Sequence, residues 1–127
     1  MTDDLTTKEK TELKIEILEQ YFPDECEIVG ASNIKPIAEG SREFIETEYG
    51  VNMPIMEVVA LIVTIVGFID SILSVIERLI KLRSKRITSE EVVMDVKSSV
   101  DLPEELDQET IEKICDYVLK RLQEKDA

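Results

Sequence analysis

Few residues of this chain have the type and spacing that catalysis or metal binding requires. Histidine, the commonest general base, is absent from the 127 residues. Two cysteines, Cys26 and Cys115, lie far apart in the sequence, an arrangement that suits neither a zinc site nor a disulfide framework. Glu25 and Glu27 flank Cys26 and should raise the pKa of its thiol, which makes it a poor nucleophile. We therefore expect two reduced, partly buried thiols without a catalytic role.

Acidic pairs and glycines are the other residues that could bind a ligand. Asp24-Glu25 and Glu104-Glu105 offer the oxygen atoms that a hard cation prefers, but such surface charges are ordinarily solvated. The four glycines are isolated, and Gly40-Ser41 is too short to cradle a phosphate. The sequence predicts that the protein is not an enzyme and that it has no catalytic site, cofactor or metal.

Charge is distributed unevenly along the chain. The net charge is −13, but residues 58–86 hold two acidic and five basic side chains and carry +3. An acidic surface repels nucleic acid, whose binding proteins need basic patches, so we expect no nucleic-acid partner. The polar, acidic N-terminus lacks the pattern of a secretory signal, and we expect a cytoplasmic protein. An alternative function is that this acidic chain inhibits a basic, toxin-like partner.

One long apolar segment, residues 54–86, is the element most able to present an interaction site. Residues 58–76 contain a single charge, Asp70, and are too long for one strand, so the segment predicts a central helix. Small and basic residues recur along it at alternating steps of four and three, which places them on one narrow face. We call these residues the seam: Ala60, Thr64, Gly67, Ser71, Ser74, Arg78, Lys81 and Lys85.

Shorter elements flank the long segment. Residues 8–21 predict an amphipathic helix, with Thr6 and Glu9 as a capping box. Residues 25–32 and 42–51 favour strands, the second with helix as the alternative. Residues 92–97 also favour a strand, although Thr88 could instead cap a helix there. A closing amphipathic helix is predicted over 107–124, with Asp107 as its cap and an apolar face formed by Ile111, Ile114, Cys115, Val118 and Leu122.

These elements predict a small α+β fold in a single domain, residues 1–127, with a disordered start over residues 1–6. The long apolar helix would pack on a short sheet between N-terminal and C-terminal amphipathic helices.

A membrane-associated effector is the main alternative, with residues 58–76 in the bilayer and an inner-membrane location. The segment approaches the length of a bilayer span, and Gly67 and Ser71 form a small-x-x-x-small motif. Against this alternative, Asp70 would lie inside the span at a cost of about 2.5–3.5 kcal/mol. A soluble core helix avoids that cost.

The order of elements over residues 24–122 resembles the effector-associated constant component domains of bacterial conflict systems. The features that carry the resemblance are an acidic strand-bearing start, the long helix, the cluster ArgSerLysArg at 83–86, a strand, and a closing helix that begins near AspGlnGluThr at 107–110. This resemblance implies a non-catalytic adaptor that couples one protein to another. We therefore expect a module that binds a protein partner or forms a homo-oligomer through the seam.

Overall fold

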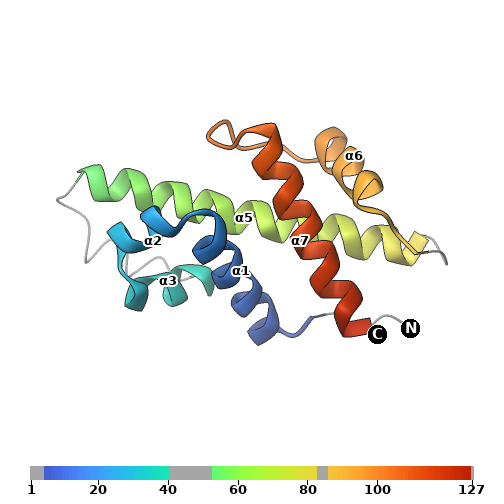
Figure 1. Cartoon of the computed structure of the whole chain (residues 1–127), viewed down its shortest axis with the longest axis horizontal. Coiled ribbons are helices and arrows are strands. Elements are labelled where there is room, and N and C mark those ends of the chain that lie inside the picture. Colours follow the sequence, from blue (N-terminus) through green and yellow to red (C-terminus); the bar gives the residue numbers. More distant parts are fainter. Residues whose placement is uncertain (1–4, 41–52, 83–85, 127) are drawn as a thin grey trace. The chain divides into compact units, whose positions relative to one another are not determined.

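The computed structural model describes residues 5–40, 53–82 and 86–126, and every regular element within these ranges is a helix (Figure 1). The helices are α1 (Thr7–Tyr21), α2 (Pro23–Val29), α3 (Ala31–Ala38), α5 (Met53–Leu82), α6 (Ser89–Ser99) and α7 (Gln108–Asp126). The prediction of an α+β fold with a short sheet is wrong, because no strand occurs in the described part of the chain. The strand predicted over 42–51 lies outside the described residues.

The chain divides into two compact units, and the boundary between them falls within α5. One unit spans Thr7–Val66, and the other comprises Met1–Thr6 and Gly67–Ala127. Two compact units can still fold together as one domain. The prediction of a single domain over residues 1–127 therefore stays a prediction. The predicted disordered start lies outside the described residues as far as residue 4, whereas Leu5 is buried.

Helices α1, α2 and α3 contact one another in the unit that spans Thr7–Val66. The helix predicted over residues 8–21 is confirmed as α1, which buries Leu13, Ile17 and Leu18. Their spacing of four and one places these side chains on one side of the helix. The sequence periodicity therefore located this helix correctly.

Residues 25–32 form the end of α2 and the start of α3, so the strand predicted there is wrong. Pro23 occupies the first turn of α2, where its missing N–H costs nothing, and Asp24 and Glu25 complement the positive end of the helix dipole. Gly30 separates the two helices with a φ of +96°, which glycine adopts readily. These helix-initiating residues outweigh the strand propensity of Ile28 and Val29.

Residues 92–97 belong to α6, and the strand predicted for them is also wrong. Thr88 and Glu91 form a capping box, in which the Glu91 N–H donates to Thr88 Oγ1 at 3.2 Å and the Thr88 N–H donates to Glu91 Oε1 at 3.4 Å. Val92 and Val96 are fully buried, one helical turn apart. The cap and this helical spacing together overcome the strand propensity of the β-branched residues.

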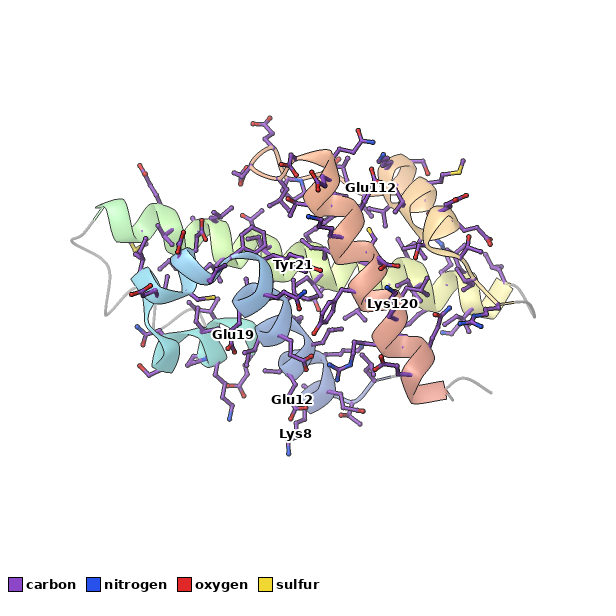
Figure 2. The ribbon with its side chains drawn as sticks, in the orientation of Figure 1. Lys8, Glu12, Glu19, Tyr21, Glu112 and Lys120 are labelled. Atoms are coloured by element: carbon purple, nitrogen blue, oxygen red, sulfur yellow. The ribbon has the colours of Figure 1, made fainter. Side chains whose placement is uncertain are left out.

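The closing helix α7 begins after Asp107, whose Oδ1 accepts a hydrogen bond of 2.8 Å from the Thr110 N–H. Its predicted apolar face is buried: Ile111, Ile114, Cys115, Val118 and Leu122 are each no more than 3% exposed. Glu112 and Lys120, labelled in Figure 2, are exposed, and Lys120 Nζ lies 2.9 Å from Asp116 Oδ2. The helix is thus amphipathic, as its sequence predicts.

Two hydrogen bonds link α7 to the first residue of α6 and to the segment just before it. Ser89 Oγ donates to Asp116 Oδ1 at 2.5 Å, and Gln123 Nε2 donates to the carbonyl oxygen of Ile87 at 3.1 Å. The hydrogen bond from Ser89 is the main cause that lowers the pKa of Asp116. Helices α6 and α7, which lie side by side in Figure 1, are therefore joined by polar contacts as well as by buried side chains.

The long apolar helix predicted over residues 54–86 is present as α5, Met53–Leu82; residues 83–85 lie outside the described residues, and Arg86 is not helical. Isoleucines recur along one side of it at alternating steps of three and four, and all are fully buried: Ile62, Ile65, Ile69, Ile72 and Ile76. β-Branched residues lower helix propensity, so this helix depends on burial of its apolar side more than on intrinsic preference.

Candidate interaction surface

The seam forms the side of α5 that faces away from the buried isoleucines. Ser71 is partly buried and the other described members are exposed, namely Ala60, Thr64, Gly67, Ser74, Arg78 and Lys81; Lys85 lies outside the described residues. A side chain at Gly67 would meet no atom within 4 Å of its Cβ, apart from the helix's own nearby backbone. Gly67 itself is therefore not in close contact with another described side chain.

Two hydroxyl groups of the seam are satisfied by their own helix. Thr64 Oγ1 donates to the carbonyl oxygen of Ala60 at 2.9 Å, and Ser71 Oγ donates to the carbonyl oxygen of Gly67 at 3.2 Å. Burying a hydroxyl that lacks a hydrogen bond is costly, but a hydroxyl bonded within its own helix largely avoids that cost. These positions are thus compatible with water and also with a protein surface.

Arg78 has a structural role within the seam. Its guanidinium forms an ion pair and hydrogen bond with Asp95 Oδ1 on α6, and Asp95 Oδ1 also accepts a 2.9 Å hydrogen bond from Ser99 Oγ. The Arg78 side chain is 50% exposed, so the pair is a surface contact that links α5 to α6. No sequence signal indicates this pairing, because the two residues are 17 positions apart on different helices.

The acidic pairs singled out in the sequence do not form a cluster of metal ligands. Asp24, Glu104 and Glu105 are exposed, and Glu25 is partly buried. Among the described residues, no group of three or more cysteine and acidic side chains is placed to hold a metal ion. That the protein is not an enzyme stays a prediction.

The two cysteines differ in burial, and both thiols are free. Burial is the largest cause that raises the pKa of Cys26, followed by the negative charges of Glu19 and Glu25. Burial, with a further contribution from Glu112, raises the pKa of Cys115 to about 12. Because the thiolate is the reactive form, the fully buried Cys115 is chemically inert in the folded state.

In the native protein at pH 8, iodoacetamide should modify Cys115 at least about tenfold more slowly than Cys26, since Cys115 is buried and protonated. Mass spectrometry of peptides after timed quenching measures both rates, and urea should make them similar. Equal rates without urea would contradict this prediction.

The same pKa has a consequence for stability. A thiol ionises near its ordinary value of 9.0 in the unfolded chain but keeps its proton to about pH 12 when folded. The contribution of the protonated Cys115 thiol to the free energy of unfolding is therefore complete below pH 9.0 and is lost as pH rises toward 12. Urea unfolding at pH 8 and pH 10 should show this loss, and Cys115→Ala should remove part of it.

α5 is long and apolar enough, over Met56–Leu82, to cross a bilayer. This property is one of length and composition, and core helices of soluble proteins share it. Within the structure, 56% of its most apolar stretch is buried. A bilayer segment and a core helix are thus both consistent with the composition of α5.

Comparison of the chain with protein-family models, with curated proteins and with solved structures finds no match.

Proposed function

We propose that this chain is a non-catalytic interaction module that self-associates through the seam of α5. The observation that carries the proposal is the contrast between the two sides of one helix. One side buries a row of isoleucines, whereas the other exposes small side chains around Gly67, with the exposed Asp70 beside them. Small side chains allow a second helix to approach closely and gain dispersion contacts along its length.

The cost of covering this face is low for two reasons. Thr64 and Ser71 already donate their hydroxyl hydrogens to the helix backbone, so a partner need not supply acceptors for them. Alanine and glycine lose no rotamer freedom when they are buried, and serine and threonine have short side chains. A modest contact area can therefore produce measurable association.

The purified chain is expected to be soluble without detergent and to have the mass of a dimer or a larger species at micromolar concentrations. Sedimentation equilibrium over a range of concentrations measures this mass directly. A monomer mass throughout the range would contradict self-association. Recovery of the protein only in the detergent-extracted fraction of cells would instead favour the membrane-associated effector.

The adaptor role in a conflict system, a cytoplasmic location and inhibition of a basic partner stay predictions. Of the layout behind the resemblance, the long helix and the closing helix are present, whereas residues 92–97 are helical and not a strand. The proposal therefore depends on the seam and not on that layout. Identification of a co-purifying protein that is lost when the seam is altered would support an adaptor role.

A further inference from the structure

Positive charge is concentrated where α5 ends. Residues 78–89 contain five basic side chains and no acidic one, although the whole chain holds 28 acidic residues. Of these five, Arg78 is paired with Asp95, and two belong to residues 83–85, outside the described residues. The other two, Lys81 and Arg86, are exposed and form no ion pair with another residue that the structure describes.

An apolar side chain lies between these two cations in the sequence. Leu82 is 74% exposed, the highest value among the exposed large apolar residues of the described chain. Attraction to the negative end of the helix dipole accounts for Lys81, which lies in the last turn of α5. It does not account for Arg86 beyond the helix, or for the exposure of Leu82. We call Lys81, Leu82 and Arg86 the basic tip.

The backbone beside Arg86 is anchored by α7. Ile87 is 4% exposed, and its carbonyl oxygen accepts a 3.1 Å hydrogen bond from Gln123 Nε2. The nearest acidic residues in the sequence are the partly buried Glu77 and the exposed Glu90. The basic tip, Ile87 and Gln123 all belong to the unit that contains Gly67–Ala127.

Cations beside an exposed aliphatic side chain match the two layers of an anionic membrane surface. Lipid phosphates attract lysine and arginine, and a leucine can enter the boundary between headgroups and acyl chains. A nucleic acid offers phosphates without such an apolar layer. A specific protein interface buries about 800 Å² on each partner, far more than three side chains supply, whereas a lipid surface is continuous and needs no matched patch.

We propose that the basic tip docks on the surface of a membrane that contains anionic phospholipid. Lys81 and Arg86 contact the phosphates, and Leu82 inserts at the acyl boundary. The net charge of −13 repels such a membrane at long range, so docking is peripheral and reversible. The inference goes beyond self-association through the seam and does not depend on it.

Co-sedimentation of the purified full-length chain with vesicles tests the role of the cations. Vesicles of phosphatidylglycerol and phosphatidylcholine in equal amounts are compared with vesicles of phosphatidylcholine alone. Lys81→Gln/Arg86→Gln should weaken binding to the anionic vesicles about 30-fold at low salt, since each cation contributes about fivefold. The control Lys8→Gln/Lys35→Gln removes the same charge from two exposed lysines on α1 and α3, one of them labelled in Figure 2, and should change binding far less.

A second pair of variants tests insertion of the leucine. Leu82→Ser should weaken binding to the anionic vesicles about tenfold, because the inserted side chain loses its apolar environment. Met94→Ser is the matched control, since Met94 is 72% exposed on α6, outside the basic tip, and should leave binding unchanged. All substituted side chains are exposed, so the variants are expected to fold, which circular dichroism checks.

Each outcome supports or overturns the proposal. A preference for anionic vesicles that both basic-tip variants lose and both controls keep supports it. Equal binding to the two kinds of vesicle, or an equal loss in basic-tip and control variants, would overturn it. Tighter binding to a short DNA duplex would also overturn it, and would assign the cations to nucleic acid.

A parent chain that binds no vesicles overturns the proposal as well. A dimer mass that Leu82→Ser then lowers would show that a second copy covers the basic tip. Sedimentation equilibrium of the parent chain without vesicles tests self-association separately, so the two proposals can fail independently.

Discussion

Ile72→Ala is expected to lower the free energy of unfolding by about 2–5 kcal/mol. Ile72 is 0% exposed and lies in the middle of the isoleucine row of α5. Removing its side-chain carbons loses the free energy gained by transferring them from water to the core. It also leaves a cavity that neighbouring side chains fill only in part. Urea unfolding without detergent measures the change, with the slope of the transition as a check on two-state behaviour.

Met94→Ala is the matched control for this substitution. Met94 is a large apolar residue within α6, but it is 72% exposed, so its truncation should change the free energy of unfolding by less than about 0.5 kcal/mol. The difference between the two variants isolates the effect of burial. If Ile72→Ala is no more destabilising than Met94→Ala, the isoleucine row is not a protein core, and the bilayer alternative gains support.

Gly67→Leu is expected to weaken self-association by roughly 5–150-fold while the monomer becomes more stable. Overpacking of a close contact costs about 1–3 kcal/mol, which corresponds to roughly 5–150-fold in a dissociation constant. In the isolated chain, Gly67 has open space beyond its Cβ, and leucine is a much better helix former than glycine. The monomer should therefore gain about 0.5–1 kcal/mol of stability.

Two measurements separate these opposite effects. Sedimentation equilibrium measures association, and urea unfolding at a concentration where the parent chain is monomeric measures the stability of the monomer. Ser98→Leu, an exposed small residue on α6 outside the seam, is the control and should leave association unchanged. A Gly67→Leu protein that is more stable but has an unchanged mass would show that the seam is simply solvated.

Long amphipathic elements could be predicted from the sequence, and short ones could not. The closing helix and the first helix, of 19 and 15 residues, each carry several apolar residues at helical spacing over two to three turns, and both form where predicted. α2 and α6 have only 7 and 11 residues. In so short a segment, the strand propensity of valine and isoleucine competes with a few initiating residues, here Pro23 and the box formed by Thr88 and Glu91.

The residues of the candidate surface were predictable, but the role of one of them was not. The seam follows from the regular spacing of small and basic residues along one helix, and its described members are exposed or partly buried. Arg78 belongs to that spacing, yet its guanidinium is engaged by Asp95 on α6. Only the packing of α6 beside this part of α5 brings the two charges together.

The sequence by itself determined the periodicity of each long helix, the division of α5 into a broad apolar side and a narrow small-to-basic side, and the scarcity of catalytic residue types. These properties are local, because the helix repeat of 3.6 residues converts spacing directly into a face. The tertiary structure decided that Arg78 pairs with Asp95 and that Ser89 bonds to Asp116. These contacts join residues distant in sequence, so they depend on how the helices of that unit pack, which spacing along one segment does not specify.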